Sequence, residues 1–242
     1  MTLRLVLGCL LIQLCAVPLL AQSSNIEIIM NRHFKARGGI EKLKTVNSIR
    51  MTGVRVLSPS PLELPIILEL QRPNKMREEL TVQGMLQITN FDGKDGWIKT
   101  SWAANKEAEP LSPEELKGLS ESEFDSPYQD WQAKGWVAEY LGRNVVDGRK
   151  VHQIRFAVTN TRTIIASFDE TTFQEVQREQ ILRSLGNEIK FRSIFDDYKM
   201  VQGISFPFYI DHRAMYRGRN IRLILSKVDV NPELNETRFT KP

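Results

Sequence analysis

Cysteine is nearly absent from this chain, and both cysteines lie close to its start. Cys9 and Cys15 are the only thiols among the 242 residues, and both fall in one short apolar segment. The chain beyond that segment can therefore form no disulfide, no cysteine-ligated metal site and no thiol nucleophile. Long apolar runs are also missing after the first 21 residues, although a membrane-spanning helix needs about 20 apolar residues.

A large excess of one charge is missing as well. The sequence has 33 lysines and arginines against 29 aspartates and glutamates, which gives a net charge of +4. Arg4 is the only charged residue in the first 21, so the remainder carries +3. This mild balance favours a mixed, soluble surface and argues against a nucleic-acid partner.

The first 21 residues have the pattern of a secretory signal peptide. Arg4 precedes an apolar run over 5–17, Pro18 interrupts it, and Ala21 stands before a polar stretch. We expect cleavage after Ala21, export from the cytoplasm, and a single domain over 22–242. An uncleaved N-terminal anchor, or lipid attachment at Cys9 or Cys15, remains an alternative.

Four short segments are predicted to be helical. Ser24 and Glu27 form a capping-box pair at the start of a helix over 24–37, and Gly38-Gly39 supplies its stop. Another turn of helix is expected over 40–45. In the middle of the chain, Ser112-Pro113-Glu114-Glu115 begins a helix over 112–120, and a second piece is expected over 126–134.

Most of the remaining chain alternates apolar and polar residues with a period of two. The alternation slips by one residue at Gly53, which indicates a β-bulge. Asp-Gly turns separate several of the runs and predict hairpins. The predicted strands lie near 48–56, 64–70, 75–82, 86–91, 97–100, 140–146, 150–158, 164–168, 173–182, 189–196, 206–216 and 221–225.

Closely spaced strands with one apolar face predict a mainly β (α+β) antiparallel meander. An open sheet of this length curls, and its edges need cover. The curled sheet could close into a barrel or wrap around the helical segments at 24–45 and 112–134.

No catalytic centre or cofactor site is visible in the sequence. His33, His152 and His212 are the only histidines, and none has the spacing of a metal-ligand motif. The serines lack the G-x-S-x-G pattern, and Gly38-Gly39 has no phosphate-loop context. We therefore expect a protein that is not an enzyme and has no metal, while a hydrolase with a scattered site is the least favoured alternative.

Aromatic side chains give one candidate ligand site. They could line an apolar cavity between the curled sheet and a helical cover, able to hold an acyl chain or an apolar peptide. Ordinary core filling is the alternative explanation. The candidate residues are Phe91, Trp97, Trp102, Trp131, Trp136, Phe206 and Phe208.

Four arginines around one turn, Arg213, Arg217, Arg219 and Arg222, give a second candidate site. They could dock an anionic lipid headgroup or an acidic partner. Charged residues that protect a sheet edge from unwanted pairing are the alternative.

Motifs along nearly the whole chain resemble the LolA-like superfamily of periplasmic proteins that sort outer-membrane lipoproteins. The first two of these motifs are HFKARGGIEKL at 33–43 and SIRMTG at 48–53. Similar pieces follow in order at 91–97, 146–149, 195–198, 201–207 and 230–242.

The resemblance implies an incomplete antiparallel barrel whose concave face is covered by helices. It also implies a monomeric, non-enzymatic periplasmic protein that carries the acyl chains of lipoproteins or other hydrophobic ligands. An envelope sensor or protein-interaction module that uses the same fold is the other functional reading.

Overall fold

The computed structural model describes residues 17–59, 62–103, 107–120, 124–184, 187–216 and 219–241. The first 16 residues of the expected signal peptide, including Cys9 and Cys15, lie outside these ranges. Among the described residues, no helix combines the length and the apolar character needed to cross a membrane.

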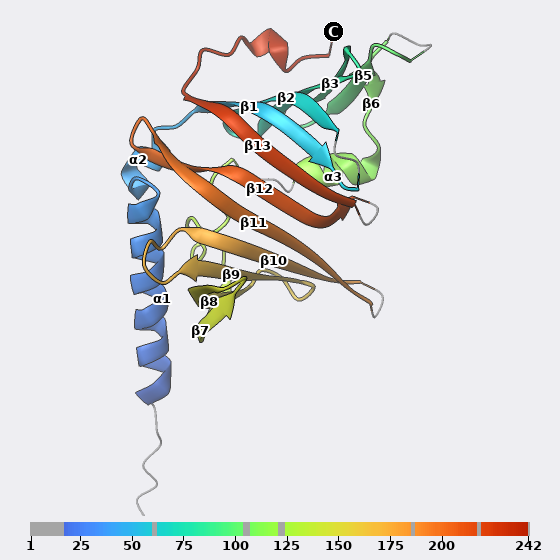
Figure 1. The fold of residues 1–242 in the computed structure, drawn as a ribbon. Coiled ribbons are helices and arrows are strands. Elements are labelled where there is room, and N and C mark those ends of the chain that lie inside the picture. Colours follow the sequence, from blue (N-terminus) through green and yellow to red (C-terminus); the bar gives the residue numbers. More distant parts are fainter. Residues whose placement is uncertain are drawn as a thin grey trace, which may run out of the picture.

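One antiparallel sheet forms the body of the molecule (Figure 1). Its strands are β1 Ser48–Leu57, β2 Glu63–Gln71, β3 Lys75–Val82, β4 Met85–Phe91, β5 Gly96–Thr100, β6 Glu109–Pro110, β7 Val137–Val146, β8 Arg149–Ala157, β9 Arg162–Asp169, β10 Glu175–Ser184, β11 Asn187–Val201, β12 Ile204–Tyr216 and β13 Arg219–Val230. The helices are α1 Val17–Ala36, α2 Ile40–Lys44, α3 Pro113–Ser120 and the 3-10 turn η1 Glu236–Arg238.

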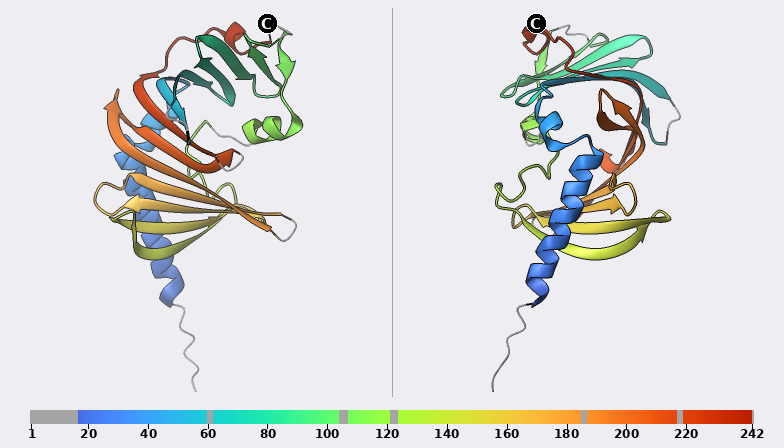
Figure 2. Two further views of the ribbon diagram at one scale, coloured as in Figure 1. Left: turned by 45° about the vertical axis from the view of Figure 1, so that its right-hand side comes forward. Right: turned by 90° about the vertical axis from the view of Figure 1, so that its left-hand side faces the viewer.

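The sheet consists of two meanders, β1–β6 and β7–β13, which are joined where β1 pairs with β13. In the described chain the strand order is β6-β5-β4-β3-β2-β1-β13-β12-β11-β10-β9-β8-β7, with β1 paired to β13. The sheet curls strongly but stays open, since β6 and β7 are its two ends (Figure 2). The expected incomplete antiparallel barrel is thus confirmed, and closure into a full barrel is wrong.

Cross-strand register assigns each side chain to one of two faces, because residues directly opposite each other point the same way. We call inner the face that includes Ile154, Ala166 and Arg178 in one cross-strand row. Strand residues on this face pack against α1, α2 and α3, and Figure 2 shows α3 within the curl. The outer face carries the alternate residues.

The bulge predicted at Gly53 is present, and close packing explains it. The register between β1 and β13 shifts between Thr52 and Gly53. A Cβ atom on Gly53 would lie 2.2 Å from the carbonyl oxygen of Ile224, so only glycine fits there. Gly38 meets a similar constraint, because it has a φ of +115° and approaches the backbone of Gly203.

Two helix predictions agree with the structure and one starts in the wrong place. α2 and α3 fall where expected, and Ser112 caps α3 by exchanging hydrogen bonds with Glu115. α1 begins at Val17 rather than at residue 24, running through the expected cleavage position after Ala21. Leucine, alanine and glutamine favour helix at 19–22, and Pro18 is tolerated in a first helical turn.

The C-terminal segment, residues 232–241, lies on the outer face of β2–β5. Arg238 donates from Nε to Glu69 at 2.6 Å and from Nη2 to Glu79 at 2.9 Å. Arg50 donates to the other oxygen of Glu69 at 2.8 Å. Glu69 is only 1% exposed, so its charge is held between two guanidinium groups.

We expect Glu69→Gln to destabilise the protein by about 2 kcal/mol, because the buried acceptor of the hydrogen bonds from Arg50 and Arg238 loses its charge. Urea unfolding gives this free energy. Glu63→Gln is the control, since Glu63 lies on the same strand and is exposed. Equal losses in the two variants would contradict the role given to Glu69.

Candidate functional site

Three apolar clusters line the inner face. The first joins Ile154, Phe156 and Phe168 of the sheet to Ile29 and Met30 of α1. The second is built on β12, β13 and β1 and packs against Leu43 of α2. The third consists of Leu64, Ile66 and Leu80, with partly buried Leu57, Val82 and Leu223 around them. In the described chain the third cluster contains strand residues alone, whereas helical residues join the other two.

A segment without regular secondary structure runs across this face. We call residues 124–136 the crossing segment. Phe124 at its start packs against the second cluster, while Tyr128, Trp131 and Trp136 pack against the first. The helix predicted over 126–134 is wrong, because this stretch is a series of turns in which Asp130 has a φ of +56°. A left-handed residue interrupts a helix.

Tyr128 fastens the crossing segment to a buried ion pair. Its hydroxyl donates to Glu175 Oε1 at 2.5 Å, and Arg178 Nε donates to the same hydroxyl at 3.0 Å. Arg178 also donates from Nη2 to Glu175 Oε2 at 2.6 Å. The guanidinium lies over the rings of Tyr128 and Phe195, at 5.3 and 5.1 Å from their centroids. The network thus joins the segment, β10 and β11.

The pKa values of Tyr128 and Arg178 are both raised, but for different reasons. Burial raises the pKa of Tyr128 well above its usual range, so the hydroxyl stays a neutral donor. Burial alone would lower the pKa of Arg178, but the adjacent Glu175 carboxylate outweighs it and raises that pKa. The Tyr128 hydroxyl and the Arg178 guanidinium therefore both keep their protons at neutral pH.

No pattern in the sequence predicts that Glu175 and Arg178 are partners. Three residues apart on a strand they should point to opposite faces. The register of β10 against β9 shifts between Glu175 and Gln177, and this irregularity brings both side chains to the inner face. The Glu175–Arg178 ion pair therefore depends on a bulge that no local sequence pattern predicts.

A second attachment holds the start of the crossing segment. Arg72 makes two hydrogen bonds to Asp125, at 2.5 and 2.6 Å, and its guanidinium lies 4.6 Å from the ring centroid of Phe124. Arg72 and Asp125 each remain about one quarter exposed, at 27% and 25%. An ion pair that is partly solvated in this way contributes only weakly to stability.

Grooves flank the crossing segment on both sides. The groove against α1 has a volume of about 490 Å³ and is lined by apolar Met30, Phe34, Ile40 and Trp131, together with polar Glu27, Lys35 and Asp130. The other groove, of about 410 Å³, is lined by Arg72, Phe124, Gln129 and Lys134 among others. Both volumes fall in the range of small-molecule sites.

The structure does not gather the seven candidate aromatics into one cavity. Phe206 and Phe208 belong to the second cluster, and Trp131 and Trp136 pack against the first. Phe91 is buried on the inner face of β4, Trp97 points to the outer face, and Trp102 is 43% exposed. Four of the seven thus meet the crossing segment or the clusters that it joins.

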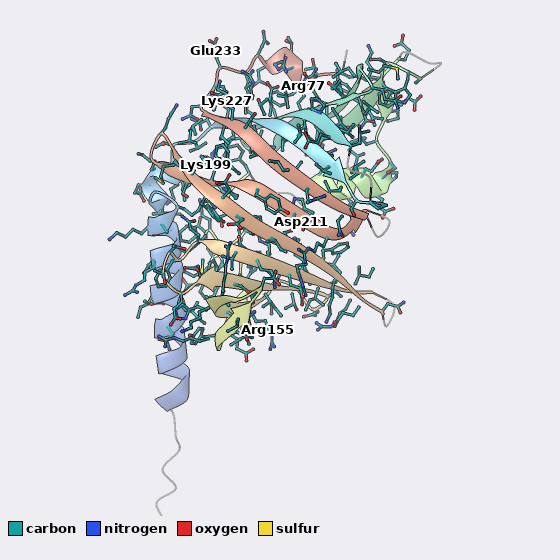
Figure 3. The ribbon with its side chains drawn as sticks, viewed as in Figure 1. Arg77, Arg155, Lys199, Asp211, Lys227 and Glu233 are labelled. Atoms are coloured by element: carbon teal, nitrogen blue, oxygen red, sulfur yellow. The ribbon has the colours of Figure 1, made fainter. Side chains whose placement is uncertain are left out.

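The candidate arginine patch includes an acidic residue. Arg213 donates to Asp211 Oδ2 at 2.9 Å, and Arg222 lies opposite Asp211 in the register of β12 and β13. Arg217 lies outside the described residues, and only the backbone of Arg219 is described. Figure 3 shows Asp211 in the middle of the sheet, far from both of its edges.

The histidines have separate structural partners. His33 donates from Nδ1 to the carbonyl of Phe173 at 2.9 Å, His152 bonds the Tyr140 hydroxyl, and His212 bonds Ser193. Within the described ranges, no three histidine, cysteine, aspartate or glutamate side chains are grouped as they would be to hold a metal ion.

Comparisons with known proteins bear on the fold. No family model matches the chain, and no curated protein matches it. An outer membrane lipoprotein-sorting protein domain from Vibrio parahaemolyticus matches with a TM-score of 0.57 and 14% identity, covering 88% of this chain and 94% of that one.

Two further solved structures are similar. A LolA superfamily protein from Nitrosomonas europaea has a TM-score of 0.58 at 13% identity, and a DUF1329 family protein from Desulfovibrio piger has 0.58 at 10% identity. Each comparison covers 89% of this chain and 97% of the other. The chain therefore has the LolA-like fold that its sequence motifs suggest.

Stability should fall as the pH drops from 7 to 5, partly because of His33. Burial, with a smaller effect from Arg37, lowers the pKa of His33 to about 4, whereas an unfolded histidine titrates near 6.5. The unfolded chain therefore takes up the proton first. The stabilisation is complete above about pH 6.5 and is lost as the pH falls toward 4, by about 2 kcal/mol at pH 5.

The measurement is urea unfolding of wild type and His33→Asn at pH 7 and pH 5. Asparagine can still donate toward Phe173 but does not titrate, so the variant should lose less stability between the two pH values. His212, whose pKa is also lowered to about 4 by burial, allows a parallel His212→Asn test. An unchanged pH dependence in His33→Asn would contradict the assignment.

Proposed function

We propose that this protein is a non-enzymatic periplasmic carrier of lipoprotein acyl chains or other hydrophobic ligands. The ligand binds on the inner face of the sheet, and the crossing segment acts as its lid. The observation that carries the proposal is that an apolar face is covered by a segment of turns with few strong attachments. Export by the N-terminal signal and a monomeric state are parts of the same proposal.

Opening requires the removal of the crossing segment from the first and second clusters. Tyr128 would give up its hydrogen bonds, while the Glu175–Arg178 ion pair would stay formed on the sheet. The buried charges therefore keep their partners when the segment leaves, and the cost of opening is mainly the loss of apolar contact.

An acyl chain can replace that apolar contact. Each buried CH₂ group contributes about 0.8 kcal/mol, so a long chain offsets the contacts of a few aromatic side chains. Phe156, which packs against Trp131, Trp136 and Tyr128, would become available to the ligand. The strand-only third cluster extends the same apolar face beyond the crossing segment.

Tyr128→Phe should make opening easier, because phenylalanine keeps the ring packing but cannot donate to Glu175. We expect a loss of about 1–2 kcal/mol in stability and faster uptake of a long-chain fluorescent fatty acid. Stopped-flow fluorescence measures the uptake. Tyr140→Phe is the matched control, since its hydroxyl bonds His152 outside the crossing segment.

Mass spectrometry of protein purified from the periplasm provides the direct test of cargo. Bound lipid or lipoprotein is expected. Absence of lipid, together with no fatty-acid uptake by either wild type or Tyr128→Phe, would reject the carrier. A specific protein complex that survives delipidation would instead favour an envelope sensor or interaction module.

A further inference from the structure

A further pocket, which we call the outer pocket, lies on the outer face, on the opposite side of the sheet from the proposed carrier site. It has a volume of about 410 Å³ and is bounded by β3, β4, β5 and the C-terminal segment. The residues that line it are Arg77, Leu86, Ile88, Trp97, Lys99, Ser101, Thr237, Arg238 and Thr240. Figure 3 shows Arg77 beneath the C-terminal segment.

The floor of this pocket is apolar. Leu86 and Ile88 alternate with inner-face residues along β4, and Trp97 continues the same face on β5. Trp97 is 5% exposed. A tryptophan and two aliphatic side chains form a surface for a ring or a short aliphatic chain.

The sides of the pocket carry more positive than negative charge. Arg77 and Arg238 both donate to Glu79, and Arg238 also shares Glu69 with Arg50. The side chain of Lys99 makes neither a hydrogen bond nor an ion pair with the residues that the structure describes. The ammonium group of Lys99 is thus a cation without a carboxylate partner at this pocket.

A buried donor at the same place also lacks an acceptor. The indole Nε1 of Trp97 is buried and has no hydrogen-bond partner among the described residues. A buried N–H without an acceptor is costly, so such groups normally meet a polar atom. Because this nitrogen is buried, a molecule in the pocket meets the apolar part of Trp97 and does not reach its N–H, so Lys99 is the polar group that faces it.

We propose that the outer pocket binds a small amphipathic anion, with a carboxylate facing Lys99 and an apolar body against Trp97, Leu86 and Ile88. The pocket is separate from the proposed acyl-chain site, because its residues alternate with those of the inner face. The C-terminal segment closes one side of it, held by the contacts of Arg238 to Glu69 and Glu79.

Methyl NMR separates the two sites. Octanoate is titrated into full-length mature protein while the methyl groups of Leu86 and Ile88 report on the outer pocket and those of Leu64 and Ile66 report on the inner face. We expect saturable shifts at Leu86 and Ile88. Octan-1-ol, which has the same tail without the charge, should bind about tenfold more weakly, and acetate should cause no saturable shift.

Two variants test the named groups. Lys99→Met removes the charge and keeps an apolar stem, and should weaken octanoate binding about tenfold while leaving octan-1-ol unchanged. Trp97→Phe makes the apolar floor smaller and should weaken the binding of octanoate and of octan-1-ol by similar factors. Lys94→Met is the control, since Lys94 is exposed in the adjacent turn.

Equal binding of octanoate and octan-1-ol, unchanged affinity in Lys99→Met, or no shift at Leu86 and Ile88 would each overturn the proposal. Shifts confined to Leu64 and Ile66 would overturn the outer pocket and still support the carrier. Shifts at Leu86 and Ile88 in a protein that takes up no long-chain fatty acid would support the outer pocket alone.

Discussion

The carboxylate of Glu175 is the charge around which the inner face is organised. It is 3% exposed, and a carboxylate buried this deeply needs hydrogen-bond and charge partners. Arg178 supplies the opposite charge, and the Tyr128 hydroxyl supplies a further hydrogen bond. Because Tyr128 belongs to the crossing segment, the requirement to satisfy one buried carboxylate also fixes where that segment lies on the sheet.

The outer face uses the same chemistry at a different place. Glu69 is buried between Arg50 and Arg238, and Arg238 belongs to the C-terminal segment. Each face of the sheet is therefore covered by a segment that a buried carboxylate helps to hold. A single open sheet of this length needs such covers, since each face would otherwise leave apolar strand residues in water.

The sequence predicts the repetitive part of this architecture well. Alternation of apolar residues locates nearly all strands, and the slip at Gly53 locates a bulge, because both are local properties of the chain. The crossing segment is an exception, because the spacing of Tyr128 and Trp131 predicts a helix whereas Asp130 turns the chain between them.

Partnerships across the sheet could not be predicted in the same way. The Glu175–Arg178 pair depends on the register of β10, and Trp97 faces outward although its aromatic character suggested the inner cavity. Both outcomes are set by strand pairing over long sequence separations. Composition and spacing contain no direct measure of that pairing.

The two covers differ in what their release would leave behind. If the C-terminal segment leaves, Glu69 keeps Arg50 but loses the charged partner Arg238, which also leaves Glu79. If the crossing segment leaves, Glu175 keeps Arg178 and loses only a neutral hydroxyl, and the Arg72–Asp125 pair that also breaks is partly solvated. In the proposed carrier the crossing segment is therefore the cover that we expect to open first, and we place ligand exchange on the inner face for this reason.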